Sequence, residues 1–154
     1  MAEDKKVLAQ TVYLEARGES EKGWKWVAWV IKTRAALGAN GVTYWGKTVQ
    51  TVCVKGQFEC YDAGKDTTIK DNELYKKIKA VTDAVYDAEF STDPTRKADQ
   101  NRGADHYHNP NTQGEWKKSE GWRANCDKVA TIGNHVFYRS KNLYDGSGKE
   151  ITST

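Results

Sequence analysis

Two glutamates four residues apart, Glu15 and Glu19, lie in the stretch VYLEARGES at residues 12–20. On a helix, Glu15 shares the inward face of Val12 and Leu8, because it follows them by three and seven residues. An apolar wall and the negative end of the helix dipole both favour the neutral carboxylic acid over the carboxylate. A glycosidase needs a protonated glutamic acid of this kind to protonate the departing glycosidic oxygen. The structural alternative is a solvated or ion-paired surface glutamate.

Glu19 stands directly after Gly18, beyond the end of the first predicted helix. Its charge suits the N-terminus of a following helix. A second catalytic acid is the other reading of the pair. The sequence favours the helix-end role, since acidic residues are common in the first turn of a helix.

Three histidines form the second group of candidates. His106 and His108 alternate in DHYHN, so on a strand they face the same side. Together with His135 they would supply three zinc ligands, the arrangement of a metal-dependent peptidase or amidase. The sequence has no HExxH and no CxxC spacing to support such a site, nor a GxSxG, Walker or GxGxxG motif. We therefore predict no metal and no cofactor, with the histidines in hydrogen-bonding roles.

The helices that must position these residues follow from the spacing of apolar side chains. They are predicted at 4–16, at about 21–37 with Ser20 as N-cap and Gly38 after the last turn, and at about 72–90. The third has the clearest apolar stripe, with intervals of four, three, four and three residues: Leu74, Ile78, Val81, Val85 and Ala88.

The remaining segments are predicted to be loops and short strands. The glycine-rich stretch 38–47 is a predicted loop, and the alternation in 48–54 fits a strand or a short helix. Residues 104–109 and 134–140 resemble strands, paired across a loop at 110–127. Helices followed by a small sheet indicate the α+β class.

The length of 154 residues fits one domain. We expect a single catalytic domain over 1–154, with a core at about 4–140 and a polar C-terminal tail, 141–154, that frays. The net charge of +3 is too small to indicate a nucleic-acid partner. No segment approaches the roughly 18–20 apolar residues of a membrane span, and the N-terminus lacks the apolar core of a signal peptide. A monomer made in a cytoplasm, without stable membrane insertion, is expected.

Aromatic residues are numerous for so polar a chain, whose mean hydropathy is −0.83. Six Trp, eight Tyr and three Phe either fill the core, where aromatic side chains dominate the energetics, or line a groove for sugar rings. Cysteine is present at three positions, 53, 60 and 126. An odd number does not indicate a disulfide framework, although Cys53 and Cys60 are close enough in sequence to pair.

Four sequence blocks occur in the order found in one known family. They are YLEARGES with WVAWVIKTR (13–20 and 26–34), VCVKGQFECYD (52–62), GADHYHNP (103–110) and IGNHVFY (132–138). In this order they resemble the cell wall hydrolase family of the SleB type, the spore-cortex-lytic enzymes. The resemblance runs from about residue 7 to 139. It implies a lysozyme-like, lytic-transglycosylase-like core of several helices with a small antiparallel β-sheet.

The resemblance also implies an activity, the cleavage of peptidoglycan between N-acetylmuramic acid and N-acetylglucosamine. The family's catalytic acid is the first glutamate of its EARGE motif, which falls on Glu15. A lytic transglycosylase needs only this carboxyl group, because the C6 hydroxyl of the muramic acid serves as nucleophile. The expected partner is the glycan strand of bacterial peptidoglycan.

Further residues are expected to bind this substrate. Amide, carboxylate and imidazole groups suit hydrogen bonds to sugar hydroxyls and N-acetyl groups, and the aromatic rings suit stacking. The candidates are Glu19, Gln57, Phe58, His106, Tyr107, Asn109 and His135. A structural role is equally open for His135, since buried polar groups are nearly always hydrogen-bonded.

Three other functions stay open at this point. A hydrolytic muramidase would use Glu19 or Asp105 to activate water, and a catalytically inactive wall-binding module would keep only the aromatic groove. A zinc amidase or peptidase would use the three histidines. A lone catalytic domain without a signal segment resembles a phage endolysin, which is made in the host cytoplasm and acts on the cell wall after release.

Overall fold

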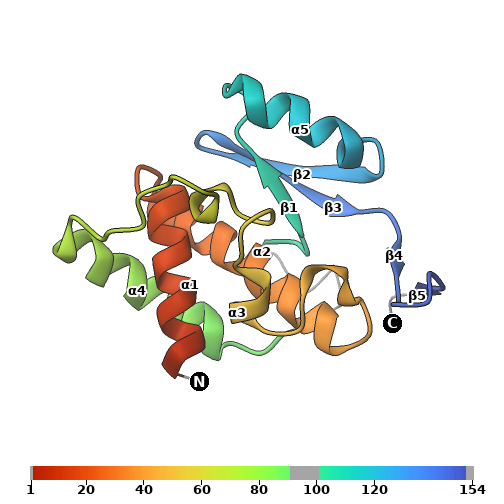
Figure 1. Ribbon diagram of the computed structural model, residues 1–154, viewed down its shortest axis with the longest axis horizontal. Helices are drawn as coiled ribbons and strands as arrows, with labels where there is room; N and C mark the ends of the chain where they lie inside the picture. The colour runs from red at the N-terminus through yellow and green to blue at the C-terminus, as the bar shows by residue number, and fades with distance from the viewer. Residues whose placement is uncertain (1, 91–100, 152–154) are drawn as a thin grey trace.

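The computed structural model describes residues 2–90 and 101–151, arranged as a helical layer, a small β-sheet and an outer helix (Figure 1). Three helices form the first layer: α1 (Ala2–Ala16), α2 (Glu21–Ala39) and α4 (Asn72–Asp87). The helices expected from the apolar spacing are therefore confirmed, with small shifts at their ends. In the described part of the chain, no helix combines the length and apolar character needed to cross a membrane.

The core of the helical layer comes from the predicted apolar faces. Fully buried side chains from all three helices meet there: Leu8, Val12, Val27, Ile31 and Ile78. Lys32 adds a polar link between two helices, because its ammonium donates to the carbonyls of Val85, Tyr86 and Ala88 at the C-terminal end of α4. A cation at this position satisfies the last carbonyls and complements the helix dipole.

Gly38 lies inside α2 and does not end it, which corrects the predicted boundary. The helix continues to Ala39, and the 3₁₀ turn η1 (Thr43–Trp45) follows. The Gly46 carbonyl then packs so closely on α2 that a Cβ atom on Gly38 would overlap it. Glycine is required here by this close approach, and the sequence pattern alone mistook it for a helix stop.

The predicted strands pair as expected in a three-stranded antiparallel sheet. Strand β1 (His106–His108) lies beside β3 (His135–Ser140), with Tyr107 opposite Phe137. The sheet order is β1-β3-β2. With helices first and the sheet after them, the predicted α+β class is confirmed.

The predicted loop at 110–127 is wrong. It contains the helix α5 (Gln113–Arg123) and the start of strand β2 (Cys126–Ile132). Trp116 and Trp122 are the only large apolar residues of α5, so the apolar stripe that marked the other helices is absent. In Figure 1, α5 covers the face of the sheet opposite the helical layer.

The described part of the polar tail, residues 141–151, contains a hairpin that the sequence did not predict. Strands β4 (Leu143–Tyr144) and β5 (Glu150–Ile151) pair in an antiparallel hairpin. The Asp145 carboxylate organises its turn by accepting from the backbone amides of Ser147 and Lys149 and from the Ser147 hydroxyl. Local hydrogen bonds of the aspartate turn, together with the packing of Leu143 and Ile151 against the core, give this segment its structure.

Two other segments follow the sequence predictions in part. For the stretch 48–54, where a strand or a short helix was expected, the structure has a short helix. This is α3 (Val49–Val52), capped by Thr48. The turn η2 (Glu59–Tyr61) lies in the connection that follows. Both segments border the region between α1 and the sheet.

Substituting Gly38 tests the close approach of α2 to Gly46. We expect Gly38→Ala to lower the free energy of unfolding by about 1–3 kcal/mol, because overpacking against backbone outweighs the gain in helix propensity. Gly121→Ala, in the interior of α5 with open space around the position, should instead raise it by up to about 1 kcal/mol. Urea denaturation followed by circular dichroism measures both, and a Gly38→Ala protein as stable as wild type would contradict the packing argument.

Candidate active site

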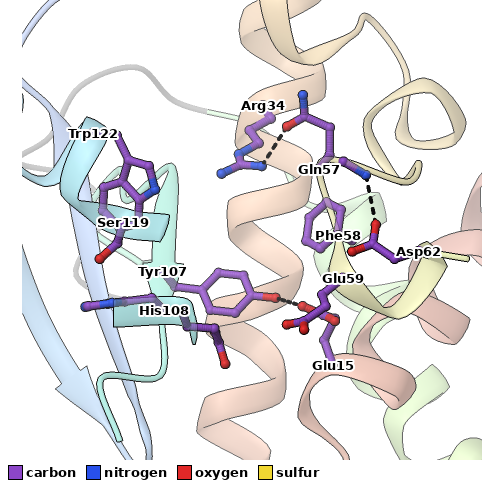
Figure 2. A pocket seen from close by; sticks show the side chains of 12 residues that line it. Glu15, Arg34, Gln57, Phe58, Glu59, Asp62, Tyr107, His108, Ser119 and Trp122 are labelled. Atoms are coloured by element: carbon purple, nitrogen blue, oxygen red, sulfur yellow. Dashed lines mark hydrogen bonds between the residues drawn. The ribbon is translucent and has the colours of Figure 1, made fainter. Parts of the chain in front are cut away.

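A cavity of about 310 Å³ opens between the helical layer, the loop after α3, and the sheet with α5 (Figure 2). Residues from five segments line it: Glu15, Arg34, Gly56, Gln57, Phe58, Glu59, Asp62, Tyr107, His108, Glu115, Ser119 and Trp122. It therefore joins Glu15, Gln57, Phe58 and Tyr107, four of the residues expected to act on or bind substrate.

Glu15 lies half-buried in the last turn of α1, and both its carboxylate oxygens are held. The Tyr107 hydroxyl donates to Oε1 at 2.7 Å, and the Cys60 backbone amide donates to Oε2 at 3.3 Å. Burial, followed by the nearby charge of Glu15, raises the pKa of Tyr107 well above its usual value. The tyrosine therefore stays a hydrogen-bond donor, and the carboxyl group is fixed from the sheet side and from the loop side.

Arg34 is a site residue that the sequence reasoning did not single out. Its side chain is 7% exposed, donates from Nε to the Asp105 carbonyl at 2.8 Å, and reaches the Gln57 side-chain oxygen at 3.5 Å. The guanidinium also lies over the rings of Trp45 and Phe58, at 5.3 and 5.7 Å from their centres. Burial lowers its pKa, and the Asp105 charge opposes that shift. The cavity thus has a buried cation in its wall.

Three further carboxylates line the cavity and were also missed. Asp62 accepts from the Gly56 amide at 3.2 Å, and Glu59 lies 4.0 Å from Lys65. Glu115 accepts from the Asn109 amide at 3.1 Å. Its pKa is raised, chiefly by burial. Glu115 lines the site because α5 folds over β1, and no apolar spacing in the sequence predicted that helix.

Glu19 does not line this cavity but ties α1 to the sheet. Its carboxylate accepts from the backbone amide and the side-chain amide of Asn134, at 2.9 and 3.0 Å. Gly133 next to it has a φ of +58°, and a Cβ atom there would overlap the same carboxylate. The structure therefore places Glu19 at the β2–β3 turn, where it holds the sheet against the helical layer.

Two other predicted binding residues lie beside the cavity. His135 is buried behind Tyr107, with ring centres 5.0 Å apart, and burial lowers its pKa against the opposing charge of Glu19. Asn109 uses its side-chain oxygen to accept from the Asn111 amide at 2.9 Å in the turn before α5. Neither side chain is among those that line the cavity.

The three histidines do not converge, which removes the zinc peptidase alternative. His106 and His108 contact Trp122 of α5, at 4.6 and 5.6 Å between ring centres. His135 packs with Tyr107 and Phe137 on the opposite face of the sheet. Alternation along β1 puts His106 and His108 on the face opposite Tyr107. The register that pairs Tyr107 with Phe137 puts His135 of β3 on the Tyr107 face.

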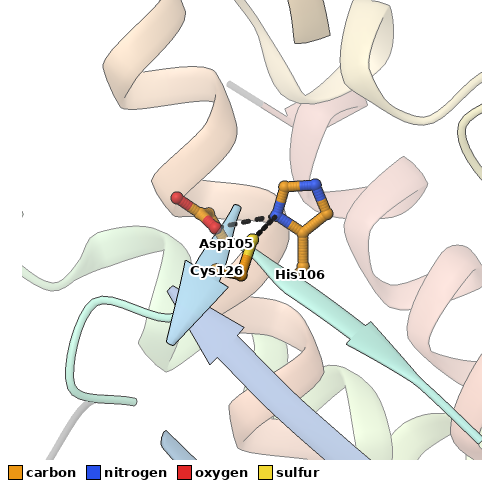
Figure 3. A group of neighbouring side chains, drawn as sticks. All are labelled: Asp105, His106 and Cys126. Atoms are coloured by element: carbon orange, nitrogen blue, oxygen red, sulfur yellow. Dashed lines mark hydrogen bonds and ion pairs between the residues drawn. The ribbon is translucent and has the colours of Figure 1, made fainter. Parts of the chain in front are cut away.

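One group of possible metal ligands occurs among the described residues, formed by Asp105, His106 and Cys126 (Figure 3). Asp105 is 2% exposed, and its Oδ1 already accepts from His106 Nδ1 at 2.8 Å and from the amide and hydroxyl of Ser140. The Cys126 sulfur lies 3.9 Å from the same imidazole nitrogen. These bonds satisfy the buried carboxylate without a metal and orient the His106 ring. Because Asp105 is used in this way, it cannot activate water beside Glu15.

The three cysteines are free thiols, and two of them border Glu15. Burial raises the pKa of Cys53 to about 12 and also raises that of Cys60. At pH 8 Cys53 is therefore a thiol, whereas the thiolate is the form that reacts with alkylating reagents.

We expect iodoacetamide at pH 8 to leave Cys53 unmodified in the folded protein and to modify all three cysteines in guanidinium chloride. Intact-mass and peptide mass spectrometry measure the difference. Alkylation of Cys53 in the folded protein at the rate seen for the unfolded chain would contradict its buried environment.

Comparison with known proteins identifies what this geometry resembles. A family model described as Cell Wall Hydrolase matches residues 18–138. The catalytic domain of the Bacillus cereus SleB protein has a similar structure, with a TM-score of 0.59, 28% identity, and coverage of 90% of this chain and 91% of that one. The catalytic domain of a germination-specific lytic transglycosylase, SleB from Bacillus anthracis, shares the fold at a TM-score of 0.52 and 24% identity, with 88% and 93% covered. No curated protein matches the sequence.

Proposed function

Because this chain belongs to the Cell Wall Hydrolase family, we propose that it cleaves peptidoglycan glycan strands as a lytic transglycosylase. The bond cleaved is that between N-acetylmuramic acid and N-acetylglucosamine, and Glu15 is the single catalytic acid. The observation that carries the proposal is the position of Glu15, half-buried at the edge of the cavity with Tyr107 and Cys60 holding its two oxygens.

Glu15 acts first as acid and then as base. Tyr107 donates to Oε1, so the transferable proton resides on Oε2, which makes only the longer bond to the Cys60 amide. This proton passes to the glycosidic oxygen as the bond to C1 of the muramic acid breaks. The resulting carboxylate takes the proton of the C6 hydroxyl, whose oxygen bonds to C1 and gives the 1,6-anhydro product. Proton transfers of this kind contribute about 10²–10⁴-fold to the rate.

Arg34 supplies the cavity's cation and positions substrate in this proposal. Its Nε is occupied by the Asp105 carbonyl, while guanidinium N–H groups at the other edge remain as donors. The acetamido carbonyl of a bound sugar, or the lactyl carboxylate of muramic acid, has the acceptor oxygen that such a donor pairs with. Gln57, held at 3.5 Å from Arg34, adds an amide at the same edge.

A hydrolytic muramidase is the second candidate, favoured by the other carboxylates of the cavity. Glu19 and Asp105, the water-activating residues considered from the sequence, are engaged with Asn134 and Ser140. Glu115 takes their place as the candidate, because it lines the same cavity and is half-buried. A water molecule activated by it would give a reducing-end muramic acid instead of the anhydro sugar.

Mass spectrometry of muropeptides released from purified peptidoglycan decides between the two reactions. We expect the wild type and Glu115→Gln to release products one water lighter than the hydrolytic ones, and Glu15→Gln to release none. Thermal unfolding of each variant confirms that it folds. Reducing-end products that disappear in Glu115→Gln would establish the muramidase, and absence of products from the wild type would leave a wall-binding module.

Removing the Tyr107 hydroxyl tests its role in orienting the acid. We expect Tyr107→Phe to lower the rate of wall-suspension clearing by at least about tenfold, because one oxygen of Glu15 is then released. The stability cost should be about 1 kcal/mol, typical of one lost hydrogen bond.

The control is Tyr61→Phe in the neighbouring turn η2. This change removes a hydroxyl that is hydrogen-bonded to the Thr11 hydroxyl of α1 at 2.7 Å. Its side chain does not line the cavity, so the clearing rate should stay within about threefold despite a similar loss of stability. Equal losses of activity in the two variants would show that the Tyr107 hydroxyl contributes to stability and not to the orientation of Glu15.

Three expectations from the sequence stay predictions. The protein is synthesised in a host cytoplasm, acts on the wall after release as a phage endolysin does, and is a monomer. The family membership supports peptidoglycan as substrate and does not bear on these three points.

A further inference from the structure

A second cavity, of about 400 Å³, adjoins the first on the other side of Trp122. Its walls come from η1, from β1 and the end of α5, and from the β4–β5 hairpin, and they include Tyr44, Trp45, His106, Trp122, Asn125 and Tyr144. Trp122 lines both cavities. Arg34 of the first cavity lies over the ring of Trp45 of the second, 5.3 Å from its centre.

We propose that this second cavity is a saccharide subsite that binds an uncharged N-acetylglucosamine unit of the glycan strand, outside the unit cleaved at Glu15. The proposal rests on the proposed function, because it extends the substrate of the same cleft. The aromatic composition and the charge of the cavity are the observations that carry it.

The aromatic residues offer the surfaces on which a pyranose ring stacks. Tyr44 and Tyr144 are 48% and 43% exposed, although large apolar side chains are usually covered. Both rings border the same cavity, and burial raises the pKa of the Tyr44 hydroxyl. Tyr44 also packs edge-on against Trp45, 4.7 Å between centres. The Tyr44 ring thus has a packed neighbour before any ligand is bound, and the Tyr144 ring lies exposed on the same cavity.

The charge of the second cavity differs from that of the first. Among the described residues that line it, none is an aspartate, glutamate, lysine or arginine. The first cavity contains Glu15, Arg34, Glu59, Asp62 and Glu115. A neutral, amide-bearing sugar fits the second environment, whereas muramic acid brings a lactyl group that carries a carboxylate or a peptide stem.

Polar groups in the second cavity match the hydroxyl and acetamido groups of such a sugar. His106 Nδ1 pairs with the buried Asp105 carboxylate, so in the neutral imidazole Nε2 is the acceptor. The exposed Asn125 side chain adds an amide from the turn after α5. The predicted role of His106 in binding substrate therefore belongs to this cavity and not to the one around Glu15.

Chitotetraose, a chain of four N-acetylglucosamine units, is the probe for the test. Glu15→Gln protein is titrated with it by isothermal titration calorimetry, in buffer containing EDTA so that the Asp105–His106–Cys126 group holds no metal. Adding Tyr44→Ala and Tyr144→Ala should weaken binding by about tenfold, and Asn125→Ala alone by about threefold. Tyr75→Ala, which removes a tyrosine ring from α4 away from both cavities, should stay within about twofold.

A kinetic measurement in the Glu15 protein separates this proposal from the proposed function. With Tyr44→Ala and Tyr144→Ala, KM for long glycan strands should rise about tenfold, while the rate on the shortest oligosaccharide that the wild type cleaves stays within twofold. Unchanged chitotetraose affinity in the double variant, or equal losses on long and short substrates, would overturn the subsite. Normal chitotetraose binding without cleavage of any substrate would overturn the proposed function alone.

Discussion

The arrangement of the site depends on one buried charge, the guanidinium of Arg34. A buried cation is tolerated only when polar and aromatic groups surround it, and here these groups come from separate segments. Asp105 directly precedes β1, while Gln57 and Phe58 belong to the loop after α3. Trp45 belongs to η1. Satisfying Arg34 therefore brings the sheet and both loops against α2, and this creates the wall of the cavity opposite Glu15.

The register of β1 determines which of its side chains faces Glu15. Tyr107 points to the helical layer and bonds to Glu15, while His106 and His108 on either side of it point to α5. A shift of one residue would exchange these faces. Two contacts fix the register. Tyr107 pairs with Phe137 across the sheet, and the Phe137 ring packs on Trp26 of α2, with 5.1 Å between ring centres. Glu19 adds a second link at the far end of β3 through Asn134.

The sequence predicts those parts whose residues follow a period or a motif. Apolar spacing located α1, α2 and α4, and the motif blocks located Glu15, Gln57, Phe58 and Tyr107, which share the cavity. α5 has no apolar stripe, because two tryptophans make its contacts with the sheet. Glu115 and Arg34 resemble a surface acid and a helix-ending base until the tertiary structure buries them. No spacing rule expresses that burial, so these two residues could be found only in the structure.

The two cavities, proposed to bind successive parts of one glycan strand, differ in charge. The first places three further carboxylates and one buried cation, Arg34, around Glu15. The second offers tyrosine and tryptophan rings without acidic or basic neighbours among its described lining residues. Remote stacking of this kind contributes to catalysis only if it holds the scissile bond at Glu15, since binding energy raises the rate through positioning. Trp122 lines both cavities, so a strand that spans them would contact this one ring at both sites.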